Sequence, residues 1–195
     1  FLYFLCLLSA CVSPPDGDIL SAQALLTKGR LASENKHYQQ ALDLFQSARE
    51  TSPAVAHLAH FESGNIYARL GQPDLASREY EFALAVDPNH AESRHNLAVL
   101  RADQGRLPEA VTLLESMSEY VPALATLSVF STKQGDYRKA TDALQRALSI
   151  EPTSADLHRD LGSLYMKQGL YEKATDVLET AWNIDSTQAE TARLL

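Results

Sequence analysis

The 195-residue chain has only two cysteines, Cys6 and Cys11, and both lie near its start. The long remainder therefore can form no disulfide and offers no thiol for catalysis or metal binding. Catalytic patterns are also absent, since the chain has no glycine-rich phosphate loop, His-Glu-x-x-His, Cys-x-x-Cys or Gly-x-Ser-x-Gly. We therefore expect a protein that is not an enzyme, binds no cofactor and acts on no small-molecule substrate.

Positive charge is scarce. Lysine and arginine number 17 against 25 aspartates and glutamates, which gives a formal net charge of −8. Affinity for nucleic acid comes mainly from neutralised phosphates, so this balance argues against a nucleic-acid partner. It also disfavours electrostatic adhesion to anionic lipid.

Long hydrophobic runs are lacking as well. The apolar stretch from Phe1 to Val12 has about 12 residues, whereas a helix needs about 20 to cross a bilayer. Its length suits the hydrophobic region of a signal peptide. The basic segment that should precede it is missing, and the chain begins with Phe1 rather than Met. We expect residues 1–10 to be a signal peptide that lacks its first few residues.

The apolar stretch ends in Leu8-Ser9-Ala10-Cys11, a leucine and two small residues before a cysteine. This pattern resembles a bacterial lipobox. The resemblance implies cleavage before Cys11, lipidation of Cys11 by acyl chains such as palmitate, and stable anchoring in a membrane of the bacterial cell envelope. Val12, rather than an aspartate, favours the outer membrane and a domain facing the periplasm. The alternative is an ordinary signal peptide cleaved after Ala10, with Cys11 incidental.

Residues 11–21 are expected to be the lipidated cysteine and a linker. The segment from Ser13 to Asp18 contains two prolines, which favour extended chain, and glycine and aspartates, which keep it solvated. The folded part should begin at about residue 22.

One turn motif recurs along the rest of the chain. It begins at Gly71-Gln72-Pro73-Asp74-Leu75-Ala76 and is repeated at 105–110, 135–140 and 169–174, with glycines 34, 30 and 34 residues apart. An earlier copy, residues 36–41, lacks the glycine. A period near 34 is typical of the tetratricopeptide repeat (TPR), a helix-turn-helix unit, and the chain resembles this family. The resemblance implies an all-α fold, a right-handed TPR superhelix (α-solenoid) of five repeats at 22–55, 57–90, 91–120, 121–154 and 155–188.

Aligned on this period, the repeats share columns of small and large apolar residues. Alanine begins each second helix, at Ala41, Ala76, Ala110, Ala140 and Ala174. A large apolar column follows at Phe45, Tyr80, Leu114, Leu144 and Leu178, and glycine fills a first-helix position at Gly29, Gly64 and Gly162. Only small side chains let two helix backbones approach closely, so we expect these columns to form the core.

The third repeat is four residues short, which predicts either a tighter loop after it or a shorter second helix. In the fourth repeat Ser131 stands where TPRs usually place an aromatic residue. We expect the seam between these repeats to be the least stable part of the array. Residues 189–195 have the phase of another first helix, so we expect them to start a capping helix or a further repeat in a longer natural chain.

TPR proteins line a concave groove with their first helices and hold a peptide there. By resemblance, we expect the groove to include Arg30, Phe61, Asn65, Arg69, His95, Asn96, Arg159 and Lys167, with Leu26, Val129, Lys133 and Met166 at further groove-facing positions. Asn65 and Asn96 are similar to the asparagine pair with which chaperone-binding TPRs hold a peptide main chain. Phe61, Pro122 and Thr126 stand where those proteins have lysine or arginine, so a clamp for a C-terminal carboxylate is not expected.

Two further features favour packing over chemistry. His57 and His60 lie one helical turn apart, a spacing that could hold a metal, but His60 occupies a bulky packing position and has no evident carboxylate partner. We therefore expect no metal site. Trp182 has helical spacing in the last repeat and is expected to be core.

These features together predict a lipid-anchored TPR adaptor that binds a protein or peptide partner in the bacterial envelope. The pattern resembles that of secretin pilotins and of assembly lipoproteins for type IV or Flp pili. Two alternatives stay open: an adaptor for peptidoglycan enzymes, and the recognition module of a longer, truncated enzyme.

Overall fold

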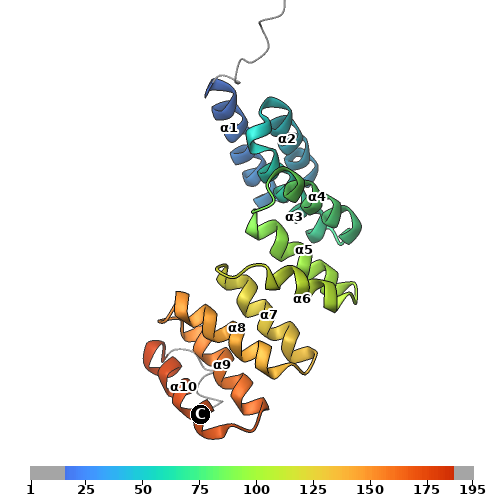
Figure 1. Ribbon diagram of the computed structural model, residues 1–195. Helices are drawn as coiled ribbons and strands as arrows, with labels where there is room; N and C mark the ends of the chain where they lie inside the picture. Colours follow the sequence, from blue (N-terminus) through green and yellow to red (C-terminus); the bar gives the residue numbers. More distant parts are fainter. Residues whose placement is uncertain (1–15, 187–195) are drawn as a thin grey trace, which may run out of the picture. The chain divides into compact units, whose positions relative to one another are not determined.

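The computed structural model describes residues 16–186, a span whose regular elements are all helices, joined by short turns, and that contains no strand (Figure 1). A short 3-10 turn, η1 (Pro53–Val55), precedes α3. The ten α-helices of this span are α1 (Asp16–Glu34), α2 (Tyr38–Thr51), α3 (Ala56–Arg69), α4 (Pro73–Val86), α5 (Ala91–Asp103), α6 (Leu107–Glu115), α7 (Val121–Lys133), α8 (Tyr137–Ile150), α9 (Ala155–Lys167) and α10 (Tyr171–Ile184). The predicted all-α class is confirmed.

Several predictions concern residues 1–15 and 187–195, which lie outside the described span. They are the signal peptide, the lipidated Cys11 and the helix expected at 189–195. Between residues 16 and 186, no helix is both long enough and apolar enough to cross a bilayer.

Tight turns join the helices into pairs. The turn glycines all have positive φ, at Gly71 (68°), Gly105 (79°), Gly135 (80°) and Gly169 (73°), a region that other residues rarely adopt. In the first pair Lys36 takes this conformation with φ 62°. Both kinds of turn close in the same way, because Gln72 N–H donates to Tyr67 O at 2.9 Å and His37 N–H donates to Ala32 O at 2.8 Å.

In three of the helix pairs, a glycine of the first helix faces a large residue of the second. A methyl group added to Gly64 would lie 2.6 Å from Tyr80 Cε1, and one added to Gly162 would lie 2.6 Å from Leu178 Cγ. Gly29 has the same relation to Phe45. The predicted core columns are confirmed. The column alanines are fully buried, at Ala41, Ala76, Ala110, Ala140 and Ala174. The large residues are at most 2% exposed, at Phe45, Tyr80, Leu114, Leu144 and Leu178.

The short third repeat is explained by a short helix. Helix α6 has 9 residues, whereas α2, α4, α8 and α10 have 14 each. Basic residues of α8 cover its end, because Lys139 Nζ lies 2.6 Å from Glu115 Oε1 and Arg146 donates to Ser118 O at 3.2 Å. A positive charge near a helix C-terminus is favourable to the helix dipole.

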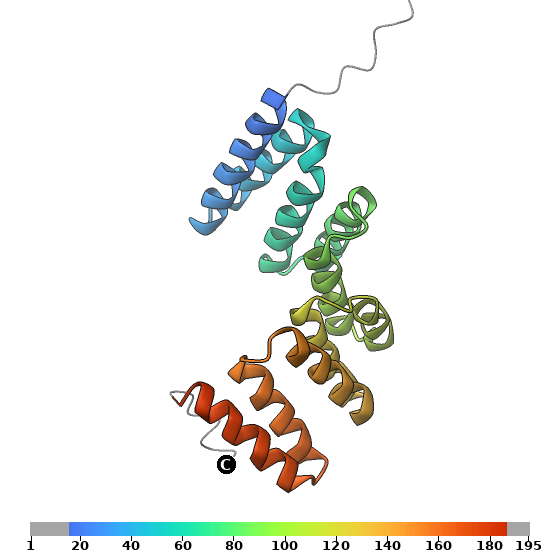
Figure 2. The same ribbon diagram turned by 60° about the vertical axis from the view of Figure 1, so that its left-hand side comes forward.

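The chain divides into two compact units at the boundary between Ser93 and Arg94, within α5. The first unit contains α1 to α4 around a core that includes Phe45 and Ile66. The second contains α6 to α10, with Leu124 and Leu161 in its core. Figure 2 shows the final pair, α9 and α10, running side by side in orange and red.

Two predictions about the first helix are wrong. Helix α1 begins at Asp16, within the span expected to be linker, because Ile19 is half-buried and Ala22 is fully buried against the first pair. The carboxylate of Asp18, in the first turn, is also favourable at a helix N-terminus. Leu26, expected in the groove, is 2% exposed and belongs to the core.

Candidate peptide-binding face

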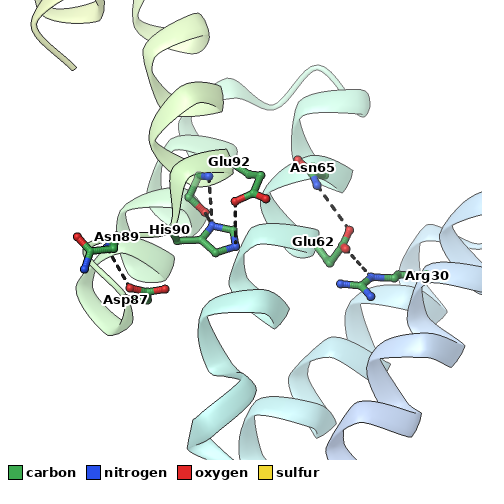
Figure 3. Close-up of polar contacts among 8 residues, drawn as sticks. Arg30, Glu62, Asn65, Asp87, Asn89, His90 and Glu92 are labelled. Atoms are coloured by element: carbon green, nitrogen blue, oxygen red, sulfur yellow. Dashed lines mark hydrogen bonds and ion pairs between the residues drawn. The ribbon is translucent and has the colours of Figure 1, made fainter. Parts of the chain in front are cut away.

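In the first unit, polar contacts join α1 and α3 (Figure 3). Arg30 Nε lies 2.6 Å from Glu62 Oε1, and Asn65 Nδ2 donates a long hydrogen bond, 3.5 Å, to Glu62 Oε2. One carboxylate therefore links two of the predicted groove residues. Because the Arg30 side chain is 47% exposed, the ion pair contributes less than about 1 kcal/mol of stability. Its main effect is to position Arg30.

The Asn65 amide is engaged at both ends. Its Oδ1 accepts a hydrogen bond of 2.8 Å from the hydroxyl of Tyr80, a residue that is 2% exposed. The large core residue of α4 thus sets the orientation of the Asn65 amide. Asn65 lies in the first unit and Asn96 in the second, and their joint role in holding one peptide stays a prediction.

Phe61 belongs to an aromatic cluster rather than standing free. Its ring centroid lies 5.0 Å from that of His90 and 6.1 Å from that of Tyr80. His57 packs edge-on against His90 at 5.4 Å. Arg69, in contrast, is exposed in the last turn of α3. The predicted groove residues of this unit are therefore of three kinds. The Phe61 ring is packed, the Asn65 amide is held by hydrogen bonds, and Arg30 and Arg69 are exposed cations.

In the second unit, His95 lies on α5 against α7. The Thr126 hydroxyl donates its single hydrogen to Pro122 O at 2.9 Å, so His95 Nε2, also at 2.9 Å from Thr126 Oγ1, must be the donor to that oxygen. Burial lowers the pKa of His95, and a hydrogen bond with the Asn96 side chain partly opposes this effect. His95 is therefore a neutral hydrogen-bond donor at pH 7.

Helix α9 carries two cations with different surroundings. Arg159 lies 2.8 Å from Asp156 Oδ1, whereas Lys167, the last residue of α9, is exposed. Lys133 ends α7 in the same way, and its Nζ lies 5.6 Å from the centroid of the Phe130 ring. Neither lysine has a carboxylate partner among residues 16–186.

Exposed apolar side chains accompany these lysines. Val129 on α7 is 51% exposed and Met166 on α9 is 36% exposed. Both occupy positions that the repeat pattern predicts to face the groove. The first helices of the second unit therefore carry apolar surface next to cations that have no carboxylate partner within the described chain.

Some functional contacts were not foreseen from the sequence. Glu62 was absent from the predicted groove residues, although its spacing of three residues from Asn65 places both on one side of α3. His60 does have a carboxylate partner, contrary to expectation, because its Nδ1 lies 2.8 Å from Glu79 Oε2.

Across residues 16–186, no group of three potential ligands could hold a metal. The prediction for Trp182 is wrong, since its side chain is 37% exposed.

These helix pairs, joined by glycine turns and packed through small residues, define a helical-repeat protein. Family models described as tetratricopeptide repeat match residues 26–76, 61–118 and 131–195. The chain belongs to the tetratricopeptide repeat family.

Curated relatives match over part of their length. Human tetratricopeptide repeat protein 8 is 29% identical over 121 residues, which are 60% of this chain and 21% of that protein. Human protein O-mannosyl-transferase TMTC1 is 30% identical over 139 residues, 66% of this chain and 15% of the transferase. The chain thus spans about a fifth or less of the length of these relatives.

Solved structures with the same fold cover almost the whole chain. PilF of Pseudomonas aeruginosa superposes with a TM-score of 0.76 at 21% identity over 91% of this chain and 82% of its own. MamA gives 0.68 at 18% identity over 89% and 96% of the two chains. YrrB, a TPR protein with an unusual peptide-binding site, gives 0.66 at 18% identity over 87% and 89%. The shared fold is that of a protein-interaction scaffold and is typically non-catalytic.

Proposed function

We propose that the protein is a non-enzymatic, lipid-anchored adaptor of the bacterial envelope that holds a peptide segment of a partner on its first helices. The lipobox-like Leu8-Ser9-Ala10-Cys11 supports the anchor. The resemblance of the lipobox and the repeats to pilotins and pilus-assembly lipoproteins motivates a role in assembling a pilus or secretin, and the fold shared with PilF along most of both chains agrees with it. Anchoring raises the effective concentration of a weak binding face near membrane partners.

The observation that carries the binding proposal is a pair of lysines that have no carboxylate partner among residues 16–186 and lie on the same helices as exposed apolar side chains. Lys133 and Lys167 end α7 and α9, and Val129 and Met166 are exposed on the same two helices. Apolar side chains provide the hydrophobic contact, and the two ammonium groups favour a negatively charged ligand. The peptide best suited to this face is an acidic segment with aliphatic side chains.

The test is fluorescence polarisation with labelled peptides in which acidic and aliphatic residues alternate, compared with amide versions of the same peptides. Binding should be tighter for the acidic set and should weaken with added salt, because exposed charge pairs are screened. The variant Lys133→Gln with Lys167→Gln should weaken binding about tenfold, since each exposed pair contributes up to about 1 kcal/mol.

The matched control is Lys173→Gln. Lys173 lies on α10, a second helix, with its Nζ 5.8 Å from the centroid of the Tyr165 ring, much as Lys133 lies over Phe130. The Lys173→Gln variant should leave the affinity for the acidic peptides unchanged. Equal binding of acidic and amide peptides, or equal losses in the control and the double variant, would overturn this site assignment.

The anchor is tested on the chain expressed in a bacterium behind a complete basic signal segment. A fatty-acid analogue should label the wild type and Cys6→Ser but not Cys11→Ser, because only Cys11 stays in the mature protein. The unlabelled variant should also leave the membrane fraction. Labelling that survives Cys11→Ser would contradict the proposal.

A second candidate is a recognition module within a longer enzyme. The partial match to an O-mannosyl-transferase, of which this chain spans 15%, favours it. The full reading frame distinguishes the two functions. A stop codon soon after Leu195 supports the adaptor, whereas several hundred further codons that encode a catalytic domain support the module.

A further inference from the structure

The first turn of α5 is held by a histidine. His90 immediately precedes α5, and the backbone N–H of Ser93 donates to His90 Nδ1 at 3.2 Å (Figure 3). Ser93 is the third residue of the helix, so its N–H is one of the first four that have no acceptor inside the helix. The His90 side chain supplies that acceptor and acts as the N-cap.

The contacts define the tautomer of the ring. Because Nδ1 accepts from the Ser93 N–H, it carries no proton, and the Ser93 hydroxyl at 2.8 Å also donates to it. The ring hydrogen is therefore on Nε2, which lies 3.7 Å from Glu92 Oε2. If Nδ1 were protonated, its N–H would face the backbone N–H of Ser93. Two donors cannot bond each other, so the capping hydrogen bond would be lost.

His90 is buried in a fixed place. It is 9% exposed, packs against the rings of Phe61 and His57 and follows a loop in which Asp87 accepts from the backbone N–H groups of both Asn89 and His90. The ionisable groups around the ring are Glu92 on α5, Asp87 in the loop, and His57 and Glu62 on α3.

We propose that His90 is a pH-sensitive cap: the neutral ring keeps the first turn of α5 closed, and protonation releases it. Positive charge at a helix N-terminus also opposes the helix dipole. Since the Phe61 ring packs against His90, release also loosens a residue of the candidate peptide-binding face.

The sign of the effect follows from the surroundings of the ring. Burial, the largest influence, and His57 lower the pKa of His90 below its ordinary 6.5, while Glu92, Asp87 and Glu62 raise it. With the cap open, the ring is solvated and takes up a proton at a higher pH than with the cap closed. The closed turn is therefore favoured above pH 6.5 and loses stability as the pH falls through and below that value.

The residue at the same position in the last repeat is a helix cap with no ionisable group, and it serves as the comparison. Ser154 precedes α9, and its hydroxyl accepts from Leu157 N–H at 3.4 Å. His90→Ser gives α5 the same kind of cap without an ionisable group. His90→Ala removes the cap at every pH.

The experiment is amide hydrogen exchange of the whole chain at pH 7.5 and pH 5, expressed as protection relative to the intrinsic rate. Protection of the Ser93 amide should fall about fivefold in the wild type, the equilibrium equivalent of one lost cap. It should be high and constant in His90→Ser, and low and constant in His90→Ala. Protection of the Leu157 amide should not change.

Nuclear magnetic resonance adds a second readout. The Phe61 ring signals should shift with the same midpoint as the His90 ring signals, and no partner is needed. The proposal is overturned if Ser93 protection stays constant while His90 titrates. It is also overturned if Ser93 and Leu157 lose protection in parallel, or if His90→Ser keeps the wild-type pH dependence.

Discussion

Gly162 of α9 packs directly against Leu178 of α10, so closely that a methyl group at Gly162 would lie 2.6 Å from Leu178 Cγ. This distance is shorter than van der Waals contact, and the two helices can pair at this spacing only because one residue has no side chain. Gly64 and Tyr80 have the same relation in the first unit. A glycine in mid-helix, normally unfavourable, is thus a packing requirement of these two helix pairs.

Gly162→Ala should therefore destabilise the protein. Alanine gains up to about 1 kcal/mol of helix propensity, but overpacking costs about 1–3 kcal/mol, so we expect a net loss measurable by urea unfolding. Combining it with Leu178→Ala should cost less than the sum of the two single changes, because the new methyl group occupies part of the vacated space.

Gly169→Ala is the control for that experiment. It should also destabilise, by about 1 kcal/mol, because of its φ of +73° and not because of contact, since nothing lies within 4 Å. Adding Leu178→Ala should not reduce the destabilisation caused by Gly169→Ala. Equal coupling of both glycines to Leu178 would contradict the packing argument.

Tyr80→Phe should cost about 1–2 kcal/mol, because the hydroxyl that donates to Asn65 Oδ1 is lost while the ring is kept. Tyr171→Phe is the matched change at a side chain that is 65% exposed, and it should change the free energy of unfolding by less than about 0.5 kcal/mol. Thermal unfolding of both variants checks the difference. Equal effects would show that the hydroxyl of Tyr80 has no special role.

Ser131→Ala should be neutral or stabilising by up to about 1 kcal/mol. The Ser131 side chain is fully buried and its Oγ has no hydrogen-bond partner within residues 16–186. Ser63→Ala is the control, because Ser63 is also buried but donates to Ala59 O at 2.9 Å. Urea unfolding should give a higher free energy of unfolding for Ser131→Ala than for Ser63→Ala. The reverse order would contradict this prediction.

Helix α6 should exchange its amide hydrogens faster than α8. It has 9 residues against 14 and therefore fewer internal hydrogen bonds to hold its ends. Arg146→Ala should increase exchange in α6, because its contact with Ser118 O is lost. Uniform protection across α6, α7 and α8 would contradict the prediction that this seam is the least stable.

Acidification should destabilise the second unit partly through His95. Burial lowers the pKa of His95 in the folded protein, so the unfolded chain takes up the proton at a higher pH. The contribution of neutral His95 is present above its ordinary pKa of 6.5 and is lost as the pH falls through the lowered pKa. Urea unfolding at pH 7.5 and 5.5 should show a smaller decrease in His95→Gln than in the wild type.

Most of the fold could be predicted because each repeat obeys the same packing rule. The spacing of Gly64, Ala76 and Tyr80 recurs along the chain, and a period near 34 is typical of a unit made of two helices and two turns. The start of α1 could not be predicted in this way, because Gly17 and two nearby prolines resemble a linker locally. Tertiary burial of Ala22 outweighs that local composition.

The binding face was predicted less completely, because a position in the repeat does not reveal which side chains satisfy one another. Arg30 and Asn65 were expected in the groove, and the structure shows that Glu62, which was not among the expected residues, engages both of them. Such contacts join residues from different helices and leave no trace in local spacing.

The sequence by itself determined the helix pairs, their small and large core positions, and the lipobox-like segment that predicts an anchor. The tertiary structure decided which polar groups are already occupied, and it made His90 a cap and left Lys133 and Lys167 without carboxylate partners in the described chain. The physical reason is that helix periodicity is a local property of the chain. Hydrogen bonds and burial between helices depend on side chains that meet only after folding.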